Sequence, residues 1–482
     1  MSKDFETKII TEKLDLKTTV MYGIGGMGED IAYNIFYMFF IFFLTSVAGI
    51  NPAAAGTISL IAVMWDAITD PIVGYLSDRY KGNKFGKRAT FILAGAIPLG
   101  LFVFILFCDV NLGQTAKILY FIMINIAFWM FFTIVDIPYI AVASEVTDDY
   151  DSKTRMRTSV LLFSAFGQVI LTVGILKFMD FMALQGKSDV LTWKIIGAVL
   201  GTVTAIAFLT TAVALRGKDR NAIKEETVKN NQSGGFIQVA FKDAKDLFHI
   251  KQYRLTACMG FLYNVFLGVS NSSLLYFLMF TCRFDNNQIA MVNFWPGIIS
   301  IMFIVPMGNL IVKLGKKSGM LIGFIILFVY SVILCFITPS TFLMMALLIC
   351  LCLASASFWI IIYAMNFDIA EIYEFKYGKR REGLIISLSS FLTKAGVAIG
   401  MWLNGIVMSL LRVDPTVEVV TESMSSALRV IYAGIPIGII FVMIVVCSRY
   451  KVNKKNITEL EQALKLKKDG EEYSLEAFKN IL

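Results

Sequence analysis

Long runs of apolar residues, separated by short charged segments, repeat along the whole chain. Residues 318–338 contain no charged residue, and neither do residues 342–366. The hydrocarbon core of a bilayer is about 30 Å thick, which a helix of roughly 20 apolar residues crosses. Because lipid offers no hydrogen bonds to the backbone, such runs predict membrane-spanning helices. Twelve spans are predicted, at residues 19–49, 54–78, 88–108, 116–143, 157–183, 191–215, 253–281, 288–312, 318–337, 340–369, 384–412 and 425–449.

The charged residues indicate how these spans are oriented. Of the 482 residues, 57% are hydrophobic and 17% are charged, whereas a soluble domain carries about 25% charged residues. When the N-terminus is placed in the cytoplasm, most of the 44 Lys and Arg residues fall in the inner segments. This is the positive-inside pattern, and it predicts that both termini are cytoplasmic. The net charge of +8 therefore reflects topology and not nucleic-acid binding.

The longest polar stretch between spans divides the chain into two halves of six spans each. Two six-helix bundles joined by a cytoplasmic loop are typical of major facilitator transporters, so we expect an all-α membrane protein of that fold. The polar tail after the last span is predicted to be helical, and Thr458 and Glu461 in it fit the pattern of a capping box. The predicted parts are a cytoplasmic N-terminus (1–18), a first bundle (19–215), a central loop (216–252), a second bundle (253–449) and a cytoplasmic tail (450–482).

Several ionisable residues lie inside the predicted spans. Each costs about 2.5–3.5 kcal/mol at the centre of an inserted helix, so such residues usually belong to a pathway or a binding site. Those of this chain are Glu29, Asp30, Asp66, Asp70, Asp136, Lys177, Asp368, Glu371 and Lys394.

The sharpest pair of buried charges is Asp66 with Asp70. A spacing of four residues puts both carboxylates on one helix face, about 6 Å apart along the axis. Two anions this close repel strongly in a low dielectric, unless a cation bridges them or a proton neutralises one. Thr133 and Asp136, one turn apart in span 116–143, could add a hydroxyl and a further carboxylate. The pattern predicts a site for a small hard cation, and the alternative is a charge cluster at a helix end.

Lys394 is a basic residue deep within the second half, whereas the acidic residues of the predicted site lie in the first half. We expect its ammonium group to face those carboxylates across a central cavity, next to the small residue Ser390. Structural pairing with Asp66 or Asp136 is the alternative. Trp359 also lies inside a span, where an aromatic face could stack on a sugar or simply pack against its neighbours.

Four motifs give the chain a resemblance to a known family. They are Tyr22–Asp30, Trp65–Pro71, Phe132–Tyr139 and Glu374–Gly383, the last followed by Lys394. Together they resemble the glycoside-pentoside-hexuronide:cation symporters of the major facilitator superfamily, the family of the melibiose carrier. The resemblance extends over roughly residues 20–450.

The resemblance implies a major facilitator fold that works by alternating access. It also implies roles for individual residues, with Thr69 standing where the melibiose carrier has an asparagine. The predicted cation-binding residues are Asp66, Asp70, Thr133 and Thr69, with Na⁺ held by the two carboxylates. The predicted substrate-binding residues are Asp30, Asp136, Trp359, Lys394 and Ser390.

Two departures from the melibiose carrier concern its sugar site. That carrier has a sugar-binding arginine in the fifth helix, whereas residues 158–170 contain none and Ser164 or Val160 occupies the place. The aromatic residue that follows its fourth-helix motif is Ile140 here. Both changes affect the expected substrate more than the expected coupling ion.

The sequence therefore predicts a secondary active symporter of a glycoside, oligosaccharide or hexuronide, coupled to Na⁺ or H⁺. It predicts no catalytic residues and no cofactor. The protein is expected in the cytoplasmic (inner) membrane, where it works as a monomer and does not bind nucleic acid. One alternative is a symporter of the same fold for lysolipids or other amphiphiles, which a side opening lined by apolar residues would favour. The other is a membrane sensor that does not transport, which an uptake assay would distinguish.

Overall fold

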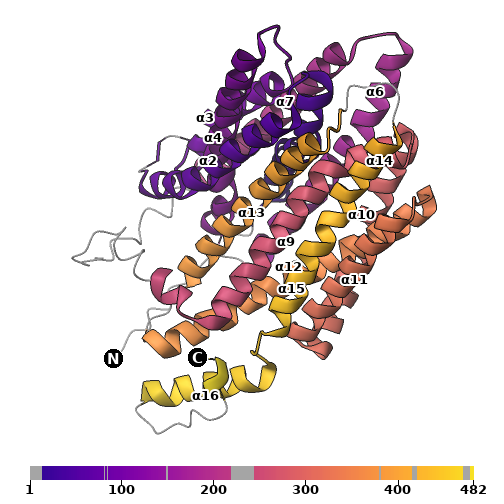
Figure 1. Ribbon diagram of the computed structural model, residues 1–482. Helices are drawn as coiled ribbons and strands as arrows, with labels where there is room; N and C mark the ends of the chain where they lie inside the picture. Colours follow the sequence, from indigo (N-terminus) through magenta and orange to yellow (C-terminus); the bar gives the residue numbers. More distant parts are fainter. Residues whose placement is uncertain are drawn as a thin grey trace. The chain divides into compact units, whose positions relative to one another are not determined.

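The computed structural model is built of helices (Figure 1). It describes residues 14–80, 82–83, 85–147, 150–218, 244–378, 382–414, 421–469 and 478–481. Within these ranges the extended structure is limited to one isolated β-bridge between Asn83 and Gly86. The first 13 residues, most of the predicted central loop and residues 379–381 of the fourth motif lie outside the described residues.

The chain forms two compact units, one of residues 1–43 and 65–230 and the other of residues 44–64 and 231–482. The helices up to the central loop are α1 (Leu16–Ile35), η1 (Phe36–Phe40), η2 (Phe43–Val47), α2 (Pro52–Arg79), α3 (Ala89–Leu106), α4 (Gln114–Val146), α5 (Tyr150–Val169), η3 (Ile170–Gly174), α6 (Ile175–Leu184) and α7 (Asp189–Ala214).

After the central loop the chain is again helical, and it ends in a short helix and a 3₁₀ turn. The elements are α9 (Lys251–Tyr276), η5 (Phe277–Thr281), α10 (Asn286–Leu314), α11 (Lys316–Phe336), α12 (Thr341–Tyr377), α13 (Glu382–Leu410), α14 (Glu422–Arg429), η6 (Val430–Gly434), α15 (Ile435–Ser448), α16 (Lys454–Asp469) and η7 (Lys479–Ile481).

These helices are long and apolar enough for a membrane protein. Among the described residues, ten helical segments meet the length and hydropathy expected of a membrane span. They coincide with ten of the predicted spans, and the other two, 19–49 and 288–312, are helical as well. The expectation of an all-α membrane protein is therefore confirmed. The predicted division into bundles 19–215 and 253–449 stays a prediction.

In the first unit, two tyrosines brace α1 against α4. The Tyr22 hydroxyl donates to the Tyr139 carbonyl and the Tyr139 hydroxyl donates to the Tyr22 carbonyl, each at 3.1 Å. The two rings lie 4.8 Å apart. Next to this brace α1 approaches α5 so closely that a Cβ atom on Gly26 would lie 2.7 Å from the Val160 carbonyl oxygen. The glycines of the first motif therefore allow backbone contact, and its tyrosine fixes the position of α1.

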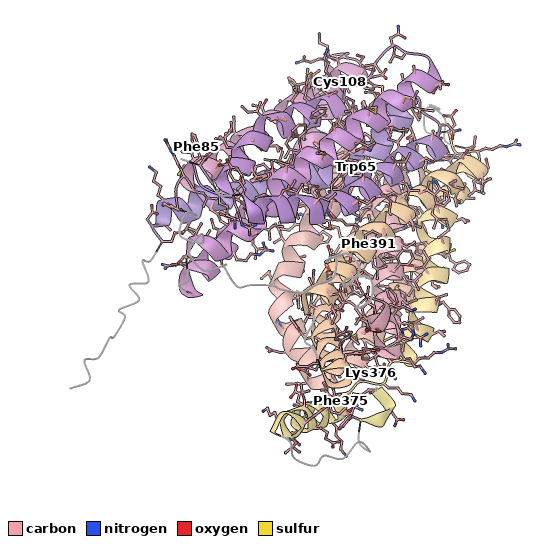
Figure 2. All side chains as sticks on the ribbon, turned by 90° about the vertical axis from the view of Figure 1, so that its left-hand side faces the viewer. Trp65, Phe85, Cys108, Phe375, Lys376 and Phe391 are labelled. Carbon is pink, nitrogen blue, oxygen red and sulfur yellow. The ribbon has the colours of Figure 1, made fainter. Side chains whose placement is uncertain are left out.

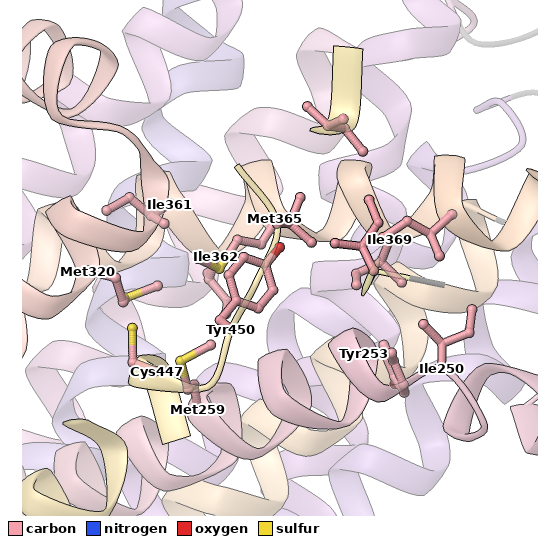
Figure 3. Close-up of a cluster of buried hydrophobic side chains, with 14 of the residues drawn as sticks. Ile250, Tyr253, Met259, Met320, Ile361, Ile362, Met365, Ile369, Cys447 and Tyr450 are labelled. Atoms are coloured by element: carbon pink, nitrogen blue, oxygen red, sulfur yellow. The ribbon is translucent and has the colours of Figure 1, made fainter. Parts of the chain in front are cut away.

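In the second unit, α9, α11, α12 and α15 enclose an apolar core (Figure 3). Met259 of α9, Met365 of α12 and Tyr450 after α15 all have no exposed surface. On another side of α9 the backbone touches α13, because a Cβ atom on Gly400 would lie 2.3 Å from the Val265 carbonyl oxygen. Such an approach requires a residue without a side chain.

The C-terminal tail packs against the same unit. Lys467 of α16 donates to the Phe375 carbonyl at 2.8 Å, and the Phe375 ring lies 5.2 Å from that of Phe478. Figure 2 shows Phe375 beside the tail. Leu460 is fully buried in the core of this unit. The tail is therefore part of the folded second unit.

The predicted capping box of Thr458 and Glu461 is wrong, because both residues lie inside α16, which begins at Lys454. The Asn453 amide donates to Asn456 Oδ1 at 2.8 Å, and the Asn456 amide donates to Asn453 Oδ1 at 3.0 Å. This reciprocal pair satisfies the amide groups that a capping box would satisfy. An Asn–Asn pair occupies the cap, so the Ser/Thr–Glu pattern pointed to the wrong turn.

The contact between α9 and α13 predicts a strong effect of one added methyl group. Gly400→Ala would force a Cβ atom into the Val265 carbonyl, at a cost of about 1–3 kcal/mol of folding free energy. Gly438→Ala in α15 is the matched control, because no atom lies within 4 Å of the added Cβ. The thermal unfolding midpoint of the detergent-solubilised protein should fall for Gly400→Ala alone. Equal midpoints for the two variants would contradict the close approach.

Candidate cation and substrate site

The first part of the site is a pair of carboxylates on α2. Asp66 is fully buried and Asp70 is partly buried, one turn further along the helix. Pro71 follows directly and lies inside α2. Because proline has no N–H, the Ala67 carbonyl loses its usual helical hydrogen-bond donor. Within about one turn, α2 thus presents two carboxylates and one backbone carbonyl oxygen that has lost its α-helical hydrogen-bond donor.

A hydroxyl group from α4 lies between the two carboxylates. Thr133 Oγ1 is 2.6 Å from Asp66 Oδ1 and 3.2 Å from Asp70 Oδ1. The two carboxylate oxygens are therefore separated by no more than the sum of these distances. A hydroxyl has one proton and donates fully to only one acceptor at a time. The residual repulsion between two buried anions favours a cation or a proton at this point.

Thr69 lies next to this pair but is oriented along its own helix. Its hydroxyl donates to the Asp66 backbone carbonyl at 3.1 Å, and the side chain is 5% exposed. The structure thus brings Asp66, Asp70 and Thr133 around one point and leaves Thr69 at its edge. Cation binding by these four residues stays a prediction.

Asp30 of α1 offers a buried oxygen to a ligand. Its Oδ1 accepts a hydrogen bond of 2.8 Å from Asn34 Nδ2. Its Oδ2 is buried, and no described residue donates a hydrogen bond to it. Gly167 of α5 leaves room beside this oxygen, since a Cβ atom there would lie 3.1 Å away. A buried acceptor without a donor is costly, and a hydroxyl group of a ligand would satisfy it.

Asp136 lies one turn after Thr133 on α4, at the tyrosine brace. Its carboxylate is within electrostatic range of both Tyr22 and Tyr139, as is that of Glu29. Glu29 has the guanidinium of Arg157 as its positive neighbour. The predicted sugar acids Asp30 and Asp136 therefore lie in the same unit as the carboxylate pair, on α1 and α4.

The remaining predicted substrate residues belong to the second unit. Trp359 is partly buried on α12, with its ring edge-on to Tyr263 at 6.2 Å and stacked on Tyr363 at 6.0 Å. Ser390 is exposed and Lys394 is half-buried, one turn apart on α13. Because Lys394 and the carboxylates belong to different units, their predicted pairing stays a prediction.

Comparisons with known proteins identify the family of the chain. Residues 21–454 match the profile of the family described as MFS/sugar transport protein. The chain belongs to this family. As an MFS/sugar transport protein, it is a multi-pass membrane transporter and not an enzyme.

Two curated relatives extend over almost the whole transporter. The uncharacterized symporter YjmB of Bacillus subtilis is 25% identical, covering 96% of this chain and 99% of the relative. The glucuronide carrier protein homolog of Escherichia coli is also 25% identical, covering 94% and 96%. Among solved structures, the nucleoside transporter NupG matches with a TM-score of 0.61 at 14% identity, covering 89% of this chain and 98% of NupG. The major facilitator fold is thereby confirmed.

Sequence reasoning missed two tyrosines of the first helix, Tyr33 and Tyr37, in the unit that holds the carboxylate pair of this transporter. Tyr37 in η1 forms a hydrogen bond with Tyr33 and lies within electrostatic range of Asp66 and Asp70. Both tyrosines stand in an aromatic run that is typical of ordinary apolar packing. Their spacing from Asp30, three and seven residues, was the available signal, because it puts them on one face of the helix.

Asp368, one of the acidic residues inside a predicted span, is part of an ion pair. Lys316 Nζ at the start of α11 lies 2.6 Å from Asp368 Oδ1 and 2.7 Å from Oδ2, and it also donates to the Ala364 carbonyl. Asp368 therefore stabilises the packing of α11 on α12 and is not a free carboxylate of a cavity.

The donor atoms of the site indicate which class of cation they suit. Among the described residues there is no group of three or more His, Cys, Asp or Glu that could hold a metal ion. Asp66, Asp70 and Thr133 supply oxygen atoms alone, which hard cations prefer, and no sulfur or imidazole for zinc or copper. The Trp65 side chain, next to this pair in the chain, is 37% exposed.

Removing the shared hydroxyl should destabilise the protein in the absence of cations. Thr133→Val keeps the shape of the side chain but removes a donor from charged acceptors, at a cost of about 1.5–3 kcal/mol. Thr133→Ser is the matched control, because it retains the hydroxyl. Thermal unfolding in a choline buffer should give a lower midpoint for Thr133→Val than for Thr133→Ser. A valine variant as stable as the serine variant would mean that the hydroxyl does not hold the pair.

Proposed function

We propose that this MFS/sugar transport protein is a secondary active symporter of a glycoside, oligosaccharide or hexuronide, driven by Na⁺ or H⁺. The observation that carries the proposal is the Thr133 hydroxyl between the fully buried carboxylate of Asp66 and the partly buried carboxylate of Asp70. A membrane protein retains such a costly cluster where an ion must bind and leave again. The relatives that are named a symporter and a glucuronide carrier homolog support the same class of transport.

The mechanism follows from the charge of the site. Without a cation, the negative pair attracts one into the protein. A bound cation neutralises the repulsion between Asp66 and Asp70 and draws α2 and α4 together through Thr133. Substrate then binds to a site that the cation has ordered. Only the empty carrier or the carrier loaded with both cation and substrate switches between the inward-open and outward-open states. Coupling is thus a free energy that the two sites share, and it acts equally in both directions.

The substrate is bound through carboxylates that accept hydroxyl groups. Asp30 Oδ2 and the Asp136 carboxylate each accept sugar hydroxyls, and a hydrogen bond to a charged acceptor contributes about 1.5–3 kcal/mol. Trp359 stacks on the sugar ring and Lys394 donates from the other bundle. The protein works as a monomer in the cytoplasmic membrane with both termini inside the cell.

The cation site is tested by removing each carboxylate. Asp66→Cys or Asp70→Cys should abolish cation-stimulated uptake, because one anion alone no longer attracts and holds the ion. Asp189→Cys is the control, because it removes a carboxylate at the exposed start of α7 that is not part of the pair. This variant should transport normally. Uptake is measured in cells with and without a Na⁺ or pH gradient, at matched membrane expression. Normal cation-stimulated accumulation in both site variants would exclude the pair as the coupling site.

The substrate site is tested at Asp136. Asp136→Asn replaces a charged acceptor by a neutral one, so substrate binding should weaken more than about tenfold. Binding is measured by equilibrium dialysis on the purified protein, with a panel of glycosides, disaccharides, hexuronides and lysolipids. An unchanged dissociation constant would remove Asp136 from the site. Binding of lysolipids but not of sugars would assign the protein to the amphiphile carriers.

A further inference from the structure

One face of α1 and its continuation η1 links the predicted substrate acid to the cation site. Asp30, Tyr33, Asn34 and Tyr37 are spaced at three, four and seven residues from the first, so they follow one another along a helix face. They are also joined pairwise, because Asn34 donates to Asp30 at 2.8 Å and Tyr37 forms a hydrogen bond with Tyr33. Two polar pairs thus follow one another along this face, Asp30 with Asn34 and then Tyr33 with Tyr37.

Tyr37 is packed tightly at the end of this face. Its side chain is 5% exposed, and its ring lies 4.5 Å from that of Tyr33 and 5.9 Å from that of Trp129. The Tyr33 ring lies 6.0 Å from that of Phe132, the residue before Thr133. The tyrosine pair of the first helix therefore packs against the part of α4 that carries Thr133.

The backbone changes its form at the same level. The α-helix ends at Ile35, and residues Phe36–Phe40 form the π-helical turn η1, in which Tyr37 is the second residue. A π turn is one residue wider than an α turn, and such turns are frequent at functional sites. Each hydrogen bond of a π turn closes one residue later than in an α turn, so the side chains of this segment are rotated relative to those of a regular helix.

We propose that Tyr37, supported by Tyr33, completes the cation site from the side of the first helix, and that the face from Tyr37 to Asp30 transmits cation occupancy to the substrate. This inference rests on the proposed symport function. A phenol oxygen is a hard ligand that adds no negative charge to a site with two carboxylates already. With a cation bound, the Tyr37 oxygen binds the cation and its proton points to Tyr33.

The chain contains a matched control for the loss of one phenol hydroxyl. Tyr330 of α11 and Tyr432 of η6 form a second buried tyrosine pair, with their hydroxyl oxygens 2.5 Å apart. Tyr432 also lies in a π-helical turn. The electrostatic neighbours of this pair are the thiols of Cys282 and Cys352 and not carboxylates. Tyr432→Phe therefore removes the same group from a similar pair without touching the cation site.

The experiment measures cation binding directly on the full-length protein. Thermal unfolding midpoints are recorded during titration with NaCl or LiCl at constant ionic strength, with choline as the replacement ion. A cation that binds only the folded protein raises the midpoint with its concentration, which gives its dissociation constant. Wild type, Tyr37→Phe, Tyr432→Phe and Asp66→Asn are compared.

We expect Tyr37→Phe to weaken Na⁺ or Li⁺ binding about tenfold or more, the loss typical of one contact to a charged group. Tyr432→Phe should bind like wild type, and Asp66→Asn should lose the response to salt. In addition, saturating Na⁺ should tighten binding of the transported sugar much less in Tyr37→Phe than in wild type, because coupling is reciprocal.

The outcomes separate this inference from the function on which it rests. Loss of the salt response in Asp66→Asn, with wild-type behaviour of Tyr37→Phe, would overturn the role of Tyr37 and leave the carboxylate site intact. An Asp66→Asn variant that still responds to Na⁺ like wild type would overturn the proposed cation site itself. A wild-type protein that neither Na⁺ nor Li⁺ stabilises would overturn the ligand role of Tyr37, because a coupling proton needs no such ligand.

Discussion

The repulsion between two neighbouring carboxylates, one fully and one partly buried, is the constraint on which the arrangement of the first unit depends. Asp66 and Asp70 are fixed one turn apart by the covalent geometry of α2, and the membrane interior offers little dielectric screening. Around them the fold places a hydroxyl from α4, a tyrosine pair from the first helix and a proline that releases a carbonyl of α2. All of these are neutral groups, so the net negative charge is preserved. An uncompensated negative charge of this kind favours a cation or a proton.

The packing around the pair serves to hold α1 and α4 in register. The crossed hydrogen bonds between Tyr22 and Tyr139 fix one level of these helices, and the Tyr33 and Phe132 rings meet at another level. Glycines let α1 approach α5 to backbone distance, as at Gly26. The first helix is thus held rigidly near the brace. Beyond Ile35 it widens into π-helical turns, the first of which contains Tyr37.

The second unit is stabilised by different means. Its core is apolar and extends from α9 to the tail helix, so residues after the last membrane span contribute to folding. Its buried Asp368 is neutralised locally, because Lys316 contacts both carboxylate oxygens. In the first unit, by contrast, two carboxylates share the hydroxyl of Thr133. A carboxylate that is paired with a lysine on the next helix supports packing, whereas a pair of carboxylates around a hydroxyl is suited to binding.

The sequence by itself determined the helices, because a chain in lipid must satisfy its backbone hydrogen bonds within each segment, and the apolar runs mark where it does so. It also determined that Asp66 and Asp70 share a face, since a spacing of four residues is fixed by the helix itself. Only the tertiary structure decided that Thr133 lies between them, that Tyr37 is within electrostatic range of them and that Lys316 neutralises Asp368. The same holds for the start of the tail helix at an Asn–Asn pair, which a choice among local caps could not settle. The physical reason is that contacts between distant segments depend on the depth and rotation at which helices pack, and helical periodicity sets neither.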